Sequence, residues 1–424
     1  MQFRKSPLGW LVSGSFLVLL ARCSSTSNVE IPKDDATVTE DGDVTEDGGQ
    51  KDSSTPPTKL RVAQFNIKEL GTDKLVDKEN AQMKAAAQIV AKFDADIVAF
   101  NEVQYDIKGV PTASMPGSTA TNRRVAGGFD EGAENANRIN DFIKAEKAEL
   151  DYQNRIITRG NSGFAWKGDT LSNDWYVLRG WGDWAGRFNT VILSKYPIVK
   201  DEVKVLSDVV WKDLPGNHLA EMKTATGLDV PDGYPLFEKS LNIIPVDVNG
   251  TKIYLVLLHP TAPAFWSINP YRNADEIHAL VLYLDGKLPG AAPLPSDAKF
   301  IVMGDLNADV DNDGDGVDNI IKPLVEHPNL IAWYPTGGGT AGSNNGLNGQ
   351  YNTYSSRCGG VTNADPTKTF QMQLDYILPS KTLGKAIGGE VYWPAPKDDT
   401  SRADWERACL ASDHRFVYVD IPLK

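Results

Sequence analysis

FIVMGDLNAD, residues 300–309, joins an apolar segment to a cluster of polar side chains. The run 300–303 is entirely apolar, which predicts a strand buried on both faces. Gly304 ends this run, and three polar residues follow: Asp305, Asn307 and Asp309. A carboxylate at the end of a buried strand is unfavourable unless it meets a metal, a proton or a hydrogen-bond partner. The stretch alone also fits a capped turn, because Asp and Asn are common turn residues.

The same change from apolar to polar residues recurs at other predicted strands. An alternating strand over 60–67 contains Asn66, and a buried strand over 96–100 leads to Glu102. A strand over 252–258 leads to His259. Near the carboxyl terminus, two further predicted strands lie at 373–378 and 415–421. Together these strand ends supply eight polar residues: Asn66, Glu102, His259, Asp305, Asn307, Asp375, Asp413 and His414.

These residue types favour one kind of chemistry. Carboxylates and amides provide hard oxygen ligands that suit magnesium, manganese or calcium. No cysteine lies among them, so a zinc site built from thiolates is not expected. Histidines among carboxylates can donate to a phosphate oxygen or move a proton. Each residue alone also fits a strand cap, but their recurrence at strand ends favours a metal-dependent site.

The order of predicted elements indicates an α/β fold. A helix follows the first strand, with Met83, Ala87 and Val90 at helical spacing, and another is expected over 133–150. The dipeptide Asn249-Gly250 between two apolar segments predicts a hairpin. Alternation continues without a break from residue 60 to residue 424, so we expect one large domain over 60–424.

The amino terminus has the pattern of a signal peptide. Arg4 and Lys5 precede an apolar run over 8–21 that is short for a membrane span. The run closes at Cys23, which predicts a lipoprotein-like signal over 1–23 with Cys23 as the lipidated residue; Arg22 departs from the small residue usual there. The other two cysteines, Cys358 and Cys409, would then form a disulfide or remain buried thiols.

Residues 24–59 differ in composition from the rest of the chain. This segment contains the repeat VTEDGDVTEDGG and no aromatic residue, so it predicts a disordered acidic tether. The whole chain of 424 residues carries a formal net charge of −13. Such an acidic protein is not expected to bind nucleic acid broadly by electrostatics alone. A nuclease remains consistent with this charge, since metal ions can bridge acidic residues to phosphates.

The motifs resemble, in their order, those of the endonuclease/exonuclease/phosphatase superfamily, which includes pancreatic deoxyribonuclease, sphingomyelinases and inositol polyphosphate phosphatases. The matching segments are Asn66, Asn101-Glu102, LLHPTAP at 257–263, MGDLNAD at 303–309, LDYIL at 374–378 and SDHRFV at 412–417. The segments WKDLPG at 211–216 and KS at 239–240 are similar to those of secreted bacterial members.

This resemblance implies a four-layer α/β sandwich, with two mixed β-sheets packed face to face and helices outside. It also implies roles: Glu102 as the main ligand of magnesium or manganese, helped by Asn66 and Asp413. Asp305 and Asn307 would align the attacking water. His259 and His414 would hold the phosphate, with Asp375 orienting His414. One position departs from pancreatic deoxyribonuclease, where a glutamate partners the first histidine. The matching residue here is Asn189, which puts a deoxyribonuclease-like role of His259 as general acid in doubt.

The segment DVDNDGDGVDN, residues 309–319, resembles a calcium-binding loop. Its carboxylates are Asp309, Asp311, Asp313, Asp315 and Asp318. A glutamate at the twelfth position is missing. Carboxylates this close together repel one another without a cation, so a structural calcium ion is expected. The alternative is a solvated acidic turn, because salt screens exposed charges.

The sequence therefore predicts a secreted, metal-dependent phosphoester hydrolase, a nuclease or phosphodiesterase. The substrate would be nucleic acid, a nucleotide or a small organic phosphate. The protein would be a monomer of the bacterial envelope or extracellular space, attached to a membrane only through lipid on Cys23. Two alternatives stay open: a phosphomonoesterase acting on phytate-like phosphates, and a non-catalytic, calcium-stabilised surface binding module. Two aromatic residues, Trp181 and Trp184, either stack a base or pack beneath a loop.

Overall fold

A computed structural model describes residues 58–107, 134–166, 178–310, 317, 320–336, 354–355, 371–394 and 399–423. All of them belong to one compact unit, Pro56–Lys424. The predicted signal, Cys23 and nearly all of the predicted tether lie outside the described residues, as do four carboxylates of the acidic loop: Asp311, Asp313, Asp315 and Asp318. No helix within the described ranges is long and apolar enough to cross a membrane.

The first sheet of the described chain is built around the first two strands. Its order is β12-β13-β1-β2-β4-β3. The strands are β1 (Lys59–Leu70), β2 (Ile97–Val103), β3 (Asn154–Ile157), β4 (Asn189–Ser194), β12 (Gly388–Val391) and β13 (Val417–Pro422). β1 and β2 are parallel, whereas the other neighbours are antiparallel, so the sheet is mixed.

The second sheet contains the FIVMGDLNAD segment. Its order is β11-β8-β7-β6-β5. The strands are β5 (Lys204–Leu206), β6 (Leu241–Val248), β7 (Thr251–Leu258), β8 (Lys299–Asp305) and β11 (Asp375–Pro379). Only β7 and β8 pair in parallel, so this sheet is mixed too. A separate two-stranded ribbon pairs β9 (Tyr354–Ser355) with β10 (Gln371–Met372). The predicted hairpin joins β6 to β7 through Asn249 and Gly250, both at positive φ.

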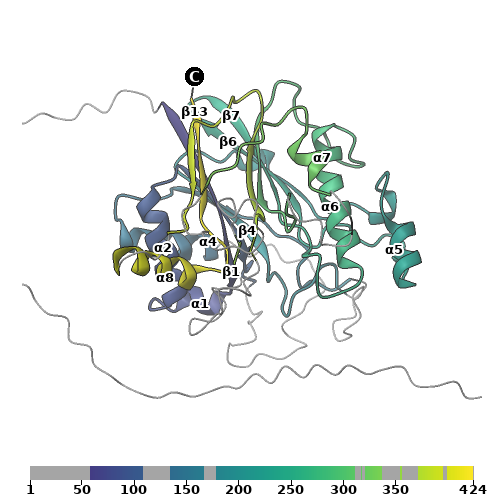
Figure 1. Cartoon of the computed structure of the whole chain (residues 1–424), viewed down its shortest axis with the longest axis horizontal. Coiled ribbons are helices and arrows are strands. Elements are labelled where there is room, and N and C mark those ends of the chain that lie inside the picture. Colours follow the sequence, from purple (N-terminus) through teal and green to yellow (C-terminus); the bar gives the residue numbers. More distant parts are fainter. Residues whose placement is uncertain are drawn as a thin grey trace, which may run out of the picture. The chain divides into compact units, whose positions relative to one another are not determined.

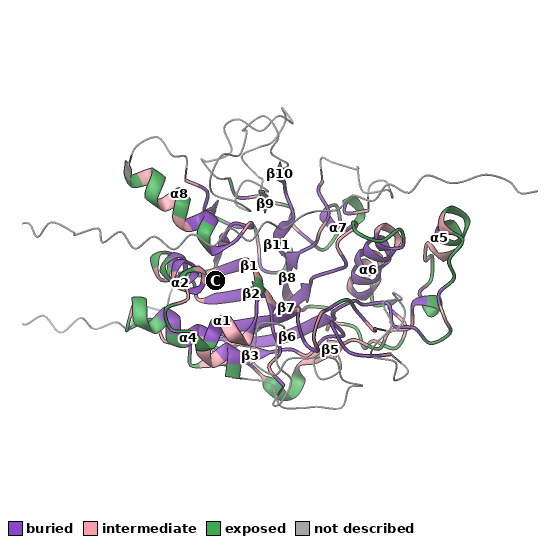
Figure 2. Ribbon diagram, turned by 90° about the horizontal axis from the view of Figure 1, so that it is seen from below, coloured by how far each residue is buried: buried purple, intermediate pink, exposed green. Residues whose placement is uncertain are grey.

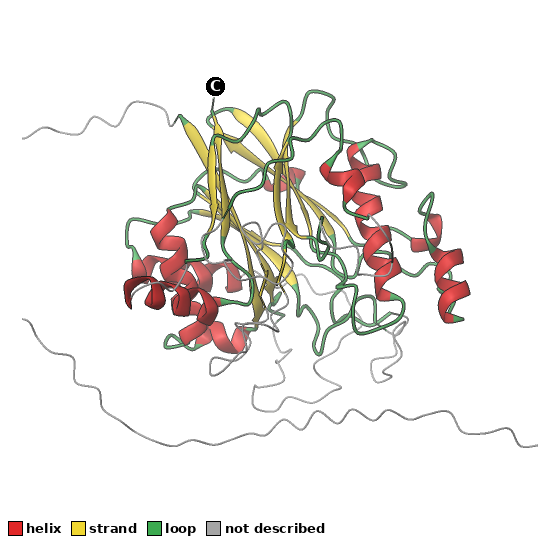
Figure 3. Cartoon of the chain, in the orientation of Figure 1, coloured by secondary structure: helices red, strands yellow, loops and turns green. Residues whose placement is uncertain are grey.

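Helices cover the outer faces of both sheets (Figures 1 and 3). Beside the first sheet are α1 (Thr72–Val76), α2 (Ala81–Phe93), α4 (Glu134–Glu146) and α8 (Asp399–Ala411). Beside the second are α5 (Leu219–Thr226), α6 (Asn269–Leu284) and α7 (Lys322–Val325). Two short 3-10 helices lie at Lys200–Glu202 and Trp211–Asp213. The helix predicted over 133–150 is shorter, because a turn begins after Glu146.

Strand periodicity explains the layers. On β8, Phe300 and Val302 belong to the core beneath α6, whereas Ile301 and Met303 belong to the core between the sheets. On β1, Phe65 faces the core beneath α2 and Val62 faces the other sheet. Successive side chains on a strand point to opposite faces, so each apolar run serves two cores. Figure 2 shows the buried strands between the outer helices. The predicted four-layer α/β sandwich is confirmed.

Candidate active site

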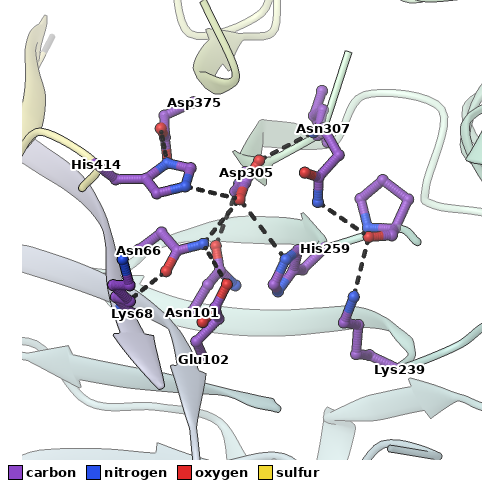
Figure 4. A network of polar contacts seen from close by, with 12 residues as sticks. Asn66, Lys68, Asn101, Glu102, Lys239, His259, Asp305, Asn307, Asp375 and His414 are labelled. Atoms are coloured by element: carbon purple, nitrogen blue, oxygen red, sulfur yellow. Dashed lines mark hydrogen bonds and ion pairs between the residues drawn. The ribbon is translucent and has the colours of Figure 1, made fainter. Parts of the chain in front are cut away.

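A cavity of about 670 Å³ opens where strands of both sheets end. Six of the predicted residues line it: Glu102, His259, Asp305, Asn307, Asp413 and His414. The other two are hydrogen-bonded to lining residues, Asn66 to Asp305 and Asp375 to His414. Figure 4 shows seven of these side chains, all except Asp413, converging from segments of both sheets. The structure thus brings together all eight residues of the predicted set.

Gly304 is required where the two sheets present their polar residues. Its φ is +148°, and a Cβ atom there would lie 1.9 Å from the carbonyl oxygen of Leu258. Glycine therefore lets β8 pass closely beside the end of β7. Asp305 follows Gly304 on β8, and His259 follows Leu258 at the end of β7. The side chains of both residues line the same cavity. A hydrogen bond of 3.2 Å from the Asp305 amide to the Asn101 side chain links this point to the first sheet.

Three side chains form a cluster that could hold a metal ion. Ligand atoms of Glu102, His259 and Asp305 all lie within 4.8 Å of one another. The Asn66 amide donates to Oδ2 of Asp305 at 2.7 Å and to Oε1 of Glu102 at 3.0 Å. Burial raises the pKa of Asp305 to about 7; the His414 charge lowers this pKa and the Asp375 charge raises it. Two oxygen donors and one imidazole in a buried acidic cluster fit a divalent cation.

This cluster differs in membership from the predicted ligand set. Glu102 is common to both. Asn66 presents its amide nitrogen to the two carboxylates, and its oxygen accepts from the Lys68 amide at 3.0 Å. Asp413 lies 2.7 Å from the Lys68 ammonium group. The structure therefore groups Glu102 with His259 and Asp305, while Asn66 donates to two members of the cluster and Asp413 pairs with Lys68.

The two histidines of the site differ in charge. Nδ1 of His414 donates to Asp375 at 2.7 Å, and its Nε2 lies 3.6 Å from Oδ2 of Asp305. Burial lowers the pKa of His414, but Asp375 and Asp305 outweigh burial and raise this pKa to about 10. His259 lies 3.6 Å from the same Asp305 oxygen. Burial, then the charges of Lys239 and His414, hold the pKa of His259 well below its usual value. The surroundings thus favour a cationic His414 and a neutral His259.

Asn189 does not take the place of a carboxylate partner for His259. Its Oδ1 accepts from the Gly160 amide at 2.5 Å, and its Nδ2 donates to the Gly186 carbonyl at 2.7 Å. The side chain therefore joins two loops. The charged neighbour of the His259 segment is Lys239 instead, whose ammonium donates to the Pro260 carbonyl at 3.1 Å. The sequence held a signal for it, the KS segment at 239–240.

A second residue that sequence reasoning missed is Glu276, on α6. It is fully buried, and its two oxygens accept from the amides of Glu238 and Thr261, both at 2.5 Å. Burial raises the pKa of Glu276 to about 7. The carboxyl group therefore joins the segment of Lys239 to the segment of His259. It lies within an amphipathic helix, so the local pattern gave no signal.

Backbone strain concentrates at the cavity. Among the described residues other than glycine, seven have positive φ, and five of these line the cavity. The five are Lys68, Glu69, Glu102, Phe265 and Asn307. Such conformations cost roughly 1–3 kcal/mol each and concentrate at functional sites.

Three further sequence predictions concern the acidic loop, the cysteines and the two tryptophans. Asp309 is buried and accepts from the Gln373 amide at 3.0 Å; the other four carboxylates of the proposed calcium loop lie outside the described residues. Cys409 is disulfide-bonded, and its partner lies beyond the described ranges. Trp181 lines the cavity, whereas Trp184 does not appear in its lining.

Comparison with known proteins agrees with this architecture. A profile of the endonuclease/exonuclease/phosphatase family matches residues 63–414. A search of curated proteins gave no match. Similar solved structures include an endonuclease/exonuclease/phosphatase from Beutenbergia cavernae DSM 12333, with 15% identity, TM-score 0.45, and coverage of 87% of this chain and 72% of that one. Sphingomyelinase C from Streptomyces griseocarneus has 16% identity and TM-score 0.42, with coverage of 86% and 99%.

Truncated Caenorhabditis elegans TDP2 is similar as well, with 14% identity, TM-score 0.42, and coverage of 86% of this chain and 98% of that one. The family match spans every strand end that supplies the cavity, from Asn66 to His414. The chain therefore belongs to the endonuclease/exonuclease/phosphatase family and is a metal-dependent hydrolase of phosphoester bonds.

Proposed function

We propose that the protein is a phosphodiesterase, of the nuclease type or acting on smaller diesters, with magnesium or manganese as its metal. One observation carries the proposal. A cationic His414 and a neutral His259 lie at the same distance, 3.6 Å, from one oxygen of Asp305, beside Glu102. This arrangement places positive charge, a proton acceptor and a metal-binding group around a space that one phosphate can fill.

The chain's own residues supply most of the chemistry. Asp305 orients the attacking water and accepts its proton, because the Asp305 carboxylate is the buried acceptor that both histidines flank at 3.6 Å. Asn307 donates its backbone amide to Asp305 at 2.9 Å and so fixes the carboxylate that accepts the proton. His414, held by Asp375, donates to a non-bridging phosphate oxygen. His259 contacts the same phosphate in its neutral form.

A divalent ion held by Glu102 and Asp305 would supply positive charge to the phosphate as negative charge develops on its oxygens. The chain keeps that position acidic by fixing Glu102, whose Oε2 accepts from the Glu69 amide at 2.8 Å. The same hydrogen bonds from Asn66 and Glu69 orient both carboxylate oxygens of Glu102.

The setting of this activity is also proposed. The lipoprotein-like signal supports secretion to the bacterial envelope with lipid on Cys23. The acidic tether would then hold the folded domain at a distance from the membrane. Under this proposal the substrates are extracellular phosphodiesters, and the protein works as a monomer.

A substrate panel tests the proposed function. The full chain is assayed with magnesium, manganese and calcium against bis(4-nitrophenyl) phosphate, 4-nitrophenyl phosphate, and single-stranded and duplex DNA. We expect hydrolysis of diesters with magnesium or manganese and none in chelator. The variant Glu102→Gln should lose this activity. Its matched control is Glu390→Gln, which changes a half-buried glutamate outside the cavity lining and should keep full activity. Hydrolysis confined to the monoester would establish a phosphomonoesterase instead, and inactivity on all substrates would favour a binding module.

A further inference from the structure

One side of the cavity is aromatic. Two segments build it: Trp181 and Phe188 from one loop, and Phe265 and Trp266 from the loop that follows His259. We call these four residues the aromatic wall. Trp181 and Trp266 pack edge to face, with ring centroids 5.5 Å apart and an interplanar angle of 73°. Ala262, Pro263 and Ala264 add further apolar surface to the cavity lining.

Phe265 is exposed in a way that packing does not explain. Its relative exposure is 92%, and its φ is +72°. A left-handed conformation costs a residue other than glycine roughly 1–2 kcal/mol, and this side chain recovers little of it by burial. Trp181 and Trp266 are also accessible, at 37% and 36%. Exposed aromatic rings beside a reactive site indicate a surface for a ligand.

Hydrogen bonds hold the loop that carries Phe265 and Trp266. The Trp266 amide donates to the Ala264 carbonyl at 2.9 Å. The Asn269 side chain donates to the same carbonyl at 2.6 Å, and its backbone amide donates to Trp266 at 3.0 Å. On the other segment, the Trp181 amide donates to buried Glu238 at 3.2 Å. The wall is therefore held in place before any ligand arrives.

The charges of the cavity argue against a substrate with several phosphates. Its described lining contains five acidic side chains, the cationic His414 and three further basic side chains. Each of these three contacts an acidic side chain: Lys68 with Asp413 at 2.7 Å, Arg187 with Glu69 at 2.7 Å and Lys239 with Glu238 at 2.8 Å. With one divalent ion added, the lining carries only about one net positive charge. Such a cavity suits a single phosphate charge and an uncharged, ring-bearing substituent.

We propose that the aromatic wall binds a flat aromatic group attached to the scissile phosphate, as in a nucleobase-bearing or aryl phosphodiester. The inference rests on the proposed phosphodiesterase function and narrows its substrate class. The ring would stack on Phe265 and Trp266 while the phosphate lies against His259 and His414. Stacking on aromatic side chains contributes roughly 1–3 kcal/mol for each base. The corresponding gain in affinity is roughly fivefold to a hundred-and-fiftyfold.

Binding of two simple diesters tests the inference without relying on turnover. Isothermal titration of the full chain with magnesium compares diphenyl phosphate with dimethyl phosphate. We expect at least about fivefold tighter binding of diphenyl phosphate. Phe265→Ser should reduce this ratio toward one without unfolding the protein, because Phe265 is exposed. Ile387→Ser is the matched control, since Ile387 is also an exposed apolar residue, at 64%, and lies outside the cavity lining.

A second pair of ligands separates the two sources of a ring. Dithymidine monophosphate and the same compound without its bases should differ in affinity if nucleobases are bound. If diphenyl phosphate binds more tightly than dimethyl phosphate but removal of the bases has no effect, the aromatic wall would be assigned to aryl esters. Equal binding of diphenyl and dimethyl phosphate would overturn the inference, even where hydrolysis of diesters is observed. Absence of all hydrolysis with the preference retained would overturn the proposed function alone.

Sedimentation with phosphatidylcholine vesicles tests whether the aromatic wall contacts a membrane. If the wall contacted a membrane instead, the wild type would sediment with vesicles and Phe265→Ser would not. That result, together with an unchanged ratio for the two diesters, would contradict a ring-binding wall.

Discussion

Nδ1 of His414 lies 2.7 Å from Oδ2 of Asp375, and the two residues lie at strands of different sheets of the sandwich. Asp375 begins β11, directly opposite Asp305 on β8, whereas His414 precedes β13. The contact therefore forms only when both sheets are packed. It keeps the imidazole oriented toward Asp305 and keeps its charge positive, because the carboxylates raise the pKa of His414 to about 10 against the effect of burial.

Asp375→Asn should lower kcat by about two orders of magnitude or more, the usual range for loss of a positioned proton donor. The neutral amide neither stabilises the imidazolium nor fixes its orientation. Steady-state kinetics on a diester substrate measure the effect. Asp275→Asn is the control, since Asp275 is also a buried aspartate bonded to a histidine, at 2.6 Å, but lies outside the cavity lining. Equal losses in both variants would indicate a general folding defect.

Glu102→Gln should abolish stabilisation by metal and lower activity about a hundredfold. An ion that binds only the native state raises the melting temperature, by mass action. Thermal melts of wild type and variant with magnesium, manganese or chelator provide the measurement. In chelator the variant should be at least as stable as the wild type, because one half-buried negative charge beside Asp305 is gone. A metal-induced shift that persists in Glu102→Gln would place the ion elsewhere.

Gly304→Ala should destabilise the fold by on the order of 3 kcal/mol or more, through both strain and steric overlap. A Cβ atom there meets the Leu258 carbonyl oxygen at 1.9 Å. Gly250→Ala is a matched control, since Gly250 has φ +84° and no atom within 4 Å of its Cβ position. That change should cost only about 1–2 kcal/mol. Urea unfolding distinguishes them, and similar losses in the two variants would mean that the close approach of β7 and β8 is unimportant.

Stability should depend on pH through His218. A hydrogen bond to Asp275 raises the pKa of His218 above its usual 6.5. A raised native pKa gives stability that is complete below the unfolded pKa and is lost as pH rises through the native value. His218→Gln should therefore reduce the free energy of unfolding more at pH 5.5 than at pH 9. In the Asp275→Asn background this difference should vanish, and its survival there would assign the pH dependence to another group.

The acidic segment 309–319 should bind calcium as a structural ion. Calcium would then raise the melting temperature without replacing magnesium or manganese in catalysis. The double variant Asp311→Asn with Asp313→Asn should lose the calcium-induced shift and keep activity at low temperature. Melts of both proteins with and without calcium make the comparison. Identical shifts in both, or none in the wild type, would leave the segment as a solvated acidic turn.

The sequence by itself determined the α/β class and most of the site. A run such as 300–303, apolar at every position, predicts a strand buried on both faces, whereas the four-layer sandwich was predicted only by the resemblance of the motifs to a known family. Polar residues that end such strands must meet one another or an ion, which made Glu102, His259, Asp305 and His414 predictable. Local chemistry is sufficient here, because an unpaired carboxylate at a buried strand end is strongly unfavourable.

Tertiary structure alone decided how these groups pair and which of them carry charge. Asn66 bonds to Asp305 across 239 positions of sequence, and no local pattern specifies which carboxylate its amide nitrogen meets. Lys239 and Glu276 join the site only through hydrogen bonds to Pro260 and Thr261, since Lys239 lies in the loop before β6 and Glu276 lies within α6. Burial and neighbouring charge then set one imidazole cationic and the other neutral. The pKa values of the two histidines depend on distances between charges and on exclusion of solvent, and both arise only when the two sheets pack together.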